Sequence, residues 1–236
     1  MQLDLREAAR LLRVEESQVY RWVRRGDLPS QRVHEQYKID RVDLLEFAAG
    51  KGITVSPELI RDAQAGGQEL PGLAEAVRAG GVHHGVPGLD KPAVLKAVVD
   101  RLPLPPRIER GFLLQMLLAR EQLGSTGLGG GIAIPHPRNP VILRVAAPAV
   151  AVCYLSTPVE FEALDGQPVH TLFTLVSPSV RVHLHLLALL STALRDPAVM
   201  ERVRARAPEA ELVEAIARVE AALPVRASPS PREDKP

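Results

Sequence analysis

The chain has 236 residues, which is enough for one small and one medium-sized domain joined by a linker. Hydrophobic residues make up 46% of it and charged residues 24%, as in ordinary soluble globular proteins, so a fibrous or wholly disordered protein is excluded. No apolar run approaches the roughly 18 residues that span a bilayer, and the first residues do not resemble a signal sequence. We therefore expect a cytoplasmic protein without a membrane partner.

Charge and cysteine content narrow the choice of partners. The net charge is +1, from 29 basic and 28 acidic residues, so any contact with nucleic acid must be local. Cys153 is the single cysteine and lies in an apolar run, which excludes an internal disulfide and a cysteine metal cluster. We expect it to be a small buried hydrophobe.

Residues 1–50 predict a small winged helix-turn-helix domain. Apolar residues recur at helical spacing from Leu5 to Leu12, and a second amphipathic helix follows that Gly26 and Pro29 end. Its apolar face carries Val19, Trp22 and Val23, which we interpret as core. Residues 29–38 read as an extended excursion, and Asp40 is placed to cap a third helix.

The segments Glu7–Val14 and Gln18–Pro29 resemble the excisionase and MerR-type DNA-binding heads, over about one fifth of the chain. The resemblance implies that double-stranded DNA is a partner and that the second helix enters the major groove. It assigns the groove contacts to Gln18, Arg21 and Arg25, and the phosphate contacts to Arg32 and Lys38. Heads of this kind often work as dimers, so a homodimer is among the expectations.

A helical protein-interaction module is the alternative for this head, because residues 1–49 carry nine basic and nine acidic side chains. The placement of the charges favours DNA, since Arg21, Arg24 and Arg25 cluster on the second helix while Glu15 and Glu16 stand at its start.

Residues 51–88 are rich in glycine and polar residues and read as a linker, in which Leu59–Ala63 and Leu70–Ala79 can form short helices. The adjacent His83 and His84 have no carboxylate or cysteine partner nearby, so we interpret them as solvated or packed and not as metal ligands. Residues 226–236 lack apolar side chains large enough to offset the entropy of ordering, and residues 225–236 are expected to form a disordered tail.

Residues 89–224 predict an α/β domain with a mixed sheet flanked by helices. The expected helices are Lys91–Leu102, Glu109–Leu123, Arg181–Leu194 and Glu209–Leu223. The expected strands are Ala147–Leu155 and His170–Val176, which are apolar and rich in β-forming residues.

The most unusual segment runs from Gly124 to Pro137 and is rich in glycine. Backbone N–H groups of such a loop can approach an anion, but it has neither the Walker lysine nor the last glycine of the dinucleotide motif, so nucleotide binding is disfavoured. Pro135 and Pro137 hold His136 on stiff, extended chain. A neutral imidazole can attack a phosphoryl group, whose oxygens Arg120 and the loop residues Ser125, Thr126 and Gly127 can contact. Without further information, a lone histidine is more often structural.

The run from Arg120 to His136 resembles the signature of the enzyme IIA domains of the bacterial phosphotransferase system, of the fructose and mannitol type and most closely the nitrogen-regulatory members. Residues 158–173 and 183–187 also resemble that family, so the similarity spans about residues 90–222. It implies that His136 accepts a phosphoryl group from a histidine-phosphocarrier protein, with Arg120 near the phosphate and His183 beside His136. No metal or other cofactor is expected.

Two residues depart from the family pattern. Pro137 replaces the glycine or small residue that often follows the active histidine, and His170 stands where the nitrogen-regulatory proteins usually carry an acidic residue. His185 lies about 200° around a helix from His183, so we interpret it as surface or packing.

Three functions remain open. The first is a DNA-binding regulator that responds to phosphorylation and uses both domains, as a phosphoryl-transfer protein and not as a stand-alone metabolic enzyme. The second is a sugar-transport IIA component that passes phosphate to a separate permease. The third is a regulator that contacts a protein target through the IIA-like domain without phosphoryl transfer.

Overall fold

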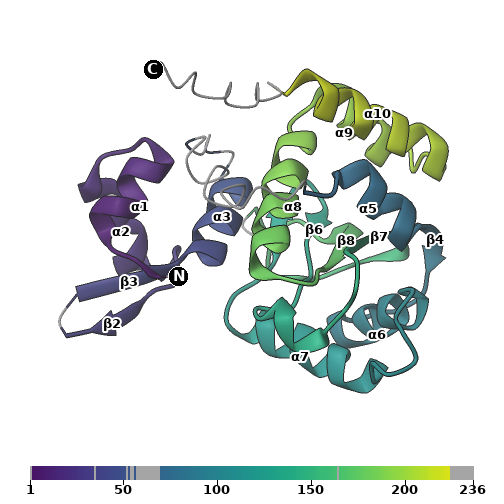
Figure 1. Ribbon diagram of the computed structural model, residues 1–236, viewed down its shortest axis with the longest axis horizontal. Helices are drawn as coiled ribbons and strands as arrows, with labels where there is room; N and C mark the ends of the chain where they lie inside the picture. Colours follow the sequence, from purple (N-terminus) through teal and green to yellow (C-terminus); the bar gives the residue numbers. More distant parts are fainter. Residues whose placement is uncertain are drawn as a thin grey trace, which may run out of the picture.

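The computed structural model describes residues 2–34, 36–51, 53, 56, 70–163 and 165–223. It consists of a small N-terminal unit, called the head below, and a larger α/β domain, with helix α3 of the head lying against helix α8 of the α/β domain (Figure 1). The predicted order of a helix-turn-helix unit followed by an α/β domain is confirmed. Within the described residues, no helix has the length and apolarity needed to cross a bilayer.

The head follows the predicted order of helix, turn, helix, hairpin and helix. Its elements are β1 (Gln2–Leu3), α1 (Leu5–Leu12), α2 (Glu16–Arg25), β2 (Gln31–Val33), β3 (Gln36–Asp40) and α3 (Arg41–Gly50). Asp4 caps α1 by accepting a hydrogen bond from the N–H of Glu7, and Gly26 ends α2 with a φ of 79°. Asp40 accepts a hydrogen bond from the N–H of Val42 at 2.8 Å, which confirms it at the start of α3.

The three strands of the head form an antiparallel sheet in the order β1-β3-β2. The half-buried Trp22 of α2 packs against Phe47 of α3, with ring centroids 4.8 Å apart. This contact ties the third helix to the helix-turn-helix pair, so the head has a small core of its own.

The α/β domain is built on a five-stranded mixed sheet in the order β4-β7-β8-β6-β5. Its strands are β4 (Val82–Val86), β5 (Gly127–Gly129), β6 (Ile132–Ala133), β7 (Ala149–Val159) and β8 (Val169–Val176). The pairs β4·β7 and β6·β8 are parallel, whereas β7·β8 and β5·β6 are antiparallel. The mixed sheet agrees with the prediction.

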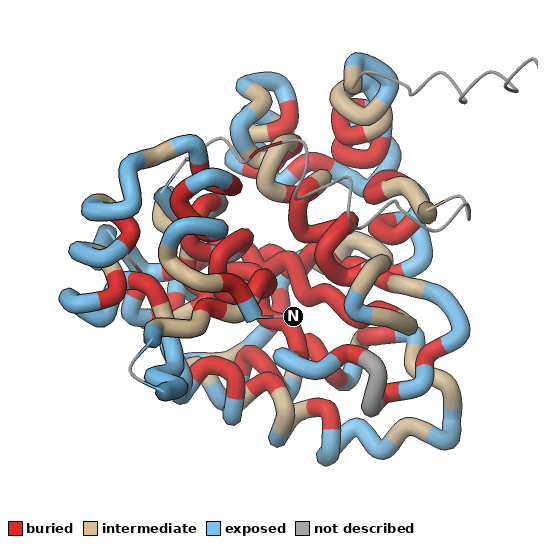
Figure 2. Tube along the Cα trace, turned by 60° about the vertical axis from the view of Figure 1, so that its left-hand side comes forward, coloured by how far each residue is buried: buried red, intermediate tan, exposed pale blue. Residues whose placement is uncertain are grey.

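Helices cover both faces of this sheet. They are α5 (Leu73–Gly80), α6 (Lys91–Arg101), α7 (Arg110–Gln122), α8 (Val180–Ala193), α9 (Pro197–Arg204) and α10 (Glu209–Ala222), and a 3-10 helix spans Pro140–Leu143. Alternation along β7 assigns Val150, Val152 and Tyr154 to the core under α5, α8 and α10, while Ala151 and Cys153 face the core under α6 and α7. Buried residues therefore gather in the middle of the molecule (Figure 2). Cys153 is fully buried, as expected.

Part of the predicted linker belongs to the sheet domain. Helix α5 packs against β7, and β4 forms the edge strand beside it. The alternating signal of β4 is weak because His83, His84 and Gly85 interrupt it, so composition alone placed it in a linker. Helix α9 and the short strands β5 and β6 were not predicted. The expected helix Leu59–Ala63 and the expected tail at 225–236 lie outside the described residues.

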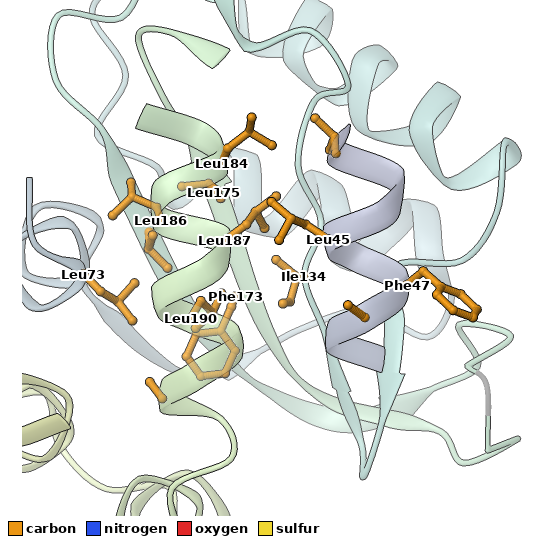
Figure 3. Close-up of a cluster of buried hydrophobic side chains, with 14 of the residues drawn as sticks. Leu45, Phe47, Leu73, Ile134, Phe173, Leu175, Leu184, Leu186, Leu187 and Leu190 are labelled. Atoms are coloured by element: carbon orange, nitrogen blue, oxygen red, sulfur yellow. The ribbon is translucent and has the colours of Figure 1, made fainter. Parts of the chain in front are cut away.

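The head and the α/β domain share a continuous apolar contact (Figure 3). Leu45 points from α3 toward Leu187 of α8, with Ile134 between the two helices, while Phe47 points to the other side of α3. Leu45 and Ile134 are each 3% exposed, and Leu187 is 2% exposed. Helix α3 thus connects the two units through opposite faces.

Candidate functional site

His136 lies on irregular chain between β6 and the 3-10 helix, and hydrogen bonds fix the backbone just before it. The N–H of Ile134 donates to the carbonyl of Thr126 at 3.0 Å, and the N–H of Leu175 donates to the carbonyl of Pro135 at 3.1 Å. The flanking prolines restrict the backbone further. The side chain of His136 therefore has a set position, and the residue is fully buried.

The ring of His136 is held as one neutral tautomer. Its Nδ1 donates to the carbonyl of Ile134 at 2.6 Å, and because a carbonyl only accepts, Nδ1 carries the proton. Nε2 then carries the lone pair. Burial, reinforced by the positive charge of Arg120, lowers the pKa of His136 to about 4. At neutral pH the ring is therefore an uncharged base with a nucleophilic Nε2.

A second histidine stands beside it. The ring centroids of His136 and His183 are 5.0 Å apart and the rings are tilted by 51°. His183, on α8, is fully buried and its Nδ1 shares a 3.1 Å hydrogen bond with the hydroxyl of Ser177. Burial lowers the pKa of His183 well below its usual value, with further lowering from His136 and Arg120. Two neutral rings can lie this close because neither adds charge to the pocket.

His185 is also buried, but the backbone near Pro71 contacts it instead of the site. Of the two interpretations, surface or packing, this position agrees with packing.

Arg120 brings positive charge to the same place from the end of α7. It is 5% exposed, and its Nη1 donates to the carbonyl of Gly124 at 2.8 Å. Burial lowers the pKa of Arg120, while Asp43 and Glu121 oppose the shift. A buried guanidinium beside a nucleophile can stabilise the charge of a phosphoryl group in transfer.

The loop before β5 lies in the site, but its hydroxyl groups are already engaged. Ser125 donates to the carbonyl of Phe161 and accepts from the N–H of Gly127 at 2.9 Å. Thr126 donates its hydroxyl to the buried carboxylate of Glu121, which Lys91 contacts at 3.4 Å. These bonds fix the shape of the loop.

The last three glycines of the segment 124–137 form a turn between strands, whereas the sequence suggested an anion-binding loop. Gly129, Gly130 and Gly131 have φ values of 97°, 60° and 76° and form the tight connection between β5 and β6. The part of the loop that reaches the site is residues 124–128.

These residues line a cavity of about 250 Å³ between the head and the α/β domain. His136, Arg120 and the loop form one side of it. The head forms the other side with Gly26, Asp27, Pro29, Asp43, Leu45 and Phe47.

Sequence reasoning did not single out Asp43. Its Oδ2 lies 3.3 Å from Nη2 of Arg138, and its side chain is 8% exposed. Burial raises the pKa of Asp43, and the charges of Arg138 and Arg120 oppose that shift. One acidic residue on a helix with an ordinary pattern gave no signal of its own, because its arginine partners come from a distant segment.

The residues proposed for DNA lie elsewhere in the head. Arg21, Arg25 and Arg32 are exposed, and Gln18 is half-buried and accepts a hydrogen bond from Arg21. Lys38 is half-buried and lines a second cavity of about 470 Å³ together with Arg120 and Arg138, so it faces the α/β domain.

The other histidines singled out in the sequence, His170, His83 and His84, lie away from the site cavity. His170 is on β8 with its Nδ1 2.8 Å from the hydroxyl of Thr171, and it does not line the site cavity. His83 contacts the carbonyl of Gly80 at 3.1 Å, and His84 packs on Tyr154 with ring centroids 4.9 Å apart. No group of three potential metal ligands occurs among the residues that the structure describes.

Comparison with known proteins decides the family. The family described as phosphoenolpyruvate-dependent sugar phosphotransferase system, EIIA 2, matches residues 79–219. The chain belongs to this family. The match begins at the end of α5 and so includes β4, in agreement with the sheet. A family described as helix-turn-helix domain matches residues 3–52, which assigns the head.

Relatives of the IIA domain include nitrogen regulatory proteins. That of Pseudomonas aeruginosa is 41% identical over 129 residues, which cover 53% of this chain and 81% of the relative. That of Escherichia coli is 39% identical over 126 residues, covering 52% and 73%. The crystal structure of nitrogen regulatory protein IIA-Ntr from Neisseria meningitidis has a TM-score of 0.54 at 27% identity and covers 61% of this chain and 98% of its own. The second domain is thus a IIA domain similar to those of nitrogen regulatory proteins, fused to a helix-turn-helix head.

Proposed function

We propose that this protein is a phosphorylation-responsive regulator whose head binds double-stranded DNA and whose His136 accepts a phosphoryl group from a histidine-phosphocarrier protein. The observation that carries the proposal is the state of His136. It is a neutral ring with its proton held on Nδ1 by Ile134 and its lone pair on Nε2, in a cavity that it shares with Arg120.

The transfer is a simple exchange of one N–P bond for another. Nε2 of His136 donates its electron pair to phosphorus as the bond between phosphorus and the donor histidine breaks, and the donor ring leaves with that electron pair. The guanidinium of Arg120 stabilises the negative charge on the three phosphoryl oxygens. His183 supplies a second neutral ring beside the reacting one.

The acceptor is tested by incubating the full chain with radiolabelled, phosphorylated carrier protein. We expect acid-labile label on the wild type and none on His136→Asn, whose amide can still donate to the carbonyl of Ile134. His170→Asn is the matched control, since that histidine lies outside the cavity, and it should keep the label. Absence of label on the wild type would contradict the proposal.

DNA binding is supported by the helix-turn-helix head and by the exposed arginines of α2. Fluorescence anisotropy with duplex DNA from upstream of the protein's own gene tests it. Arg21→Ala and Arg25→Ala should each weaken binding, by about 1–3 kcal/mol for a base contact. Arg204→Ala, an exposed arginine at the end of α9, should leave the affinity unchanged. Equal loss in all three variants would indicate only a general effect of charge.

A further inference from the structure

Helix α3 of the head covers the face of the IIA domain that carries the cavity beside His136. Helix α3 packs against α8 and β5, and Leu45 fills the space next to Leu187 and Ile134 (Figure 3). Ile134 is two residues before His136, and it provides the carbonyl to which the ring donates. The head is therefore seated directly on the segment that positions the nucleophile.

Asp43 adds a charge contact at the same place. It reaches into the cavity beside His136, ion-pairs with Arg138 and lies within the electrostatic reach of Arg120. A carboxylate thus faces the arginines that a phosphoryl group on His136 would also need. Asp43 and His136 line the same cavity.

In this arrangement Nε2 of His136 is covered, and a protein donor cannot dock directly against it. His136 is fully buried, and the head forms one wall of its cavity with the end of α2 and with α3. Transfer requires the donor phosphorus to come within bonding distance of Nε2, so the face now under α3 has to be open.

We propose that the face of the IIA domain around His136 is a docking surface shared by two occupants, the head of the same chain and the phosphocarrier protein, which exclude one another. This inference rests on the proposed acceptance of phosphate by His136. Seating of the head through Leu45 and Asp43 slows phosphorylation. A phosphate on His136, which adds about −1.5 to −2 charges, repels Asp43 and competes for its arginines, so the head is released.

The first experiment measures the initial rate of phosphoryl transfer from the carrier to the full chain. Leu45→Ala weakens the apolar contact with α8, because Leu45 points toward Leu187 whereas Phe47, which packs on Trp22, points to the other side of α3. It should speed the transfer about tenfold. Leu89→Ala is the matched control, since Leu89 is 85% exposed, and it should react at the wild-type rate.

The second experiment does not depend on a substitution in the apolar core. It measures the radius of gyration of the full chain by small-angle X-ray scattering. We expect it to increase when the wild type is phosphorylated, as the head leaves its seat. Asp43→Asn removes the charge that the phosphate repels, so the increase should be smaller in the phosphorylated variant.

The outcomes separate this inference from the proposed function. Label on His136 with equal rates for Leu45→Ala, Leu89→Ala and the wild type, or with an unchanged radius of gyration, would overturn the shared surface and leave His136 as an acceptor. Absence of label on every form, Leu45→Ala included, would overturn the proposed function and this inference together.

Discussion

Acid sensitivity is the sharpest quantitative consequence of burying a neutral histidine. Burial lowers the pKa of His136 to about 4, whereas in the unfolded chain it returns to about 6.5. As the pH falls below 6.5 the unfolded state takes up the proton first, so the free energy of unfolding decreases. The loss from His136 is about 2 kcal/mol between pH 7 and pH 5, and about 3.4 kcal/mol once the pH is below 4. Above pH 7 this residue contributes no pH dependence.

Urea unfolding of the wild type and of His136→Asn at pH 7 and at pH 5 isolates this contribution. Acidification should cost the wild type about 2 kcal/mol more than the variant, because asparagine does not titrate. Nitrogen NMR of the histidine rings provides an independent check, with Nδ1 protonated and Nε2 unprotonated down to about pH 5. A His136 that titrates near 6.5, or an equal loss of stability in both proteins, would refute the argument.

Three further substitutions test the packing. Gly80→Ala should destabilise the IIA domain by about 2 kcal/mol or more in thermal unfolding, because a Cβ there would lie 2.3 Å from the backbone of Val150. Gly111→Ala, also in a helix but with no atom within 4 Å of the added Cβ, should stabilise it by about 0.5–1 kcal/mol, and a loss there would contradict the reasoning. Ser177→Ala leaves Nδ1 of the buried His183 without that hydrogen bond and should cost about 1–3 kcal/mol, whereas an unchanged midpoint would show that the bond is not needed.

Periodicity and end signals predicted the helices and the long strands because each carries its own pattern. Asp40 at the start of α3 and Gly26 at the end of α2 were readable as local signals. The edge strand β4 was not, since its register is set by β7, about seventy residues away, and its own residues alternate poorly. Short elements stabilised by tertiary pairing leave little trace in a local sequence pattern.

The site shows the same division. Pro135 and Pro137 made the stiffness of the chain at His136 readable, and the family signature pointed to Arg120 and His183, which the structure brings to the same place. The role of Asp43 could not be read, because it arises from how the head is seated and not from any motif. The cavity beside His136 likewise has walls from both domains, and neither segment encodes it alone.

The repulsion between a phosphate on His136 and Asp43 can be compared with the free energy needed to release the head. His136 and Asp43 line the same cavity, so a phosphate on His136 would face the carboxylate of Asp43 across it. At an effective dielectric constant of 20, two unit charges about 8 Å apart repel by about 2 kcal/mol, so a phosphate with nearly two charges gives about 4 kcal/mol. Reversing a 99:1 equilibrium needs about 5.5 kcal/mol. The repulsion supplies most of this amount, and loss of the arginine contacts of Asp43 to the phosphate acts in the same direction. The ion pair between Asp43 and Arg138 and the apolar contact of Leu45 hold the head in place, and of these two only the apolar contact is independent of the phosphate.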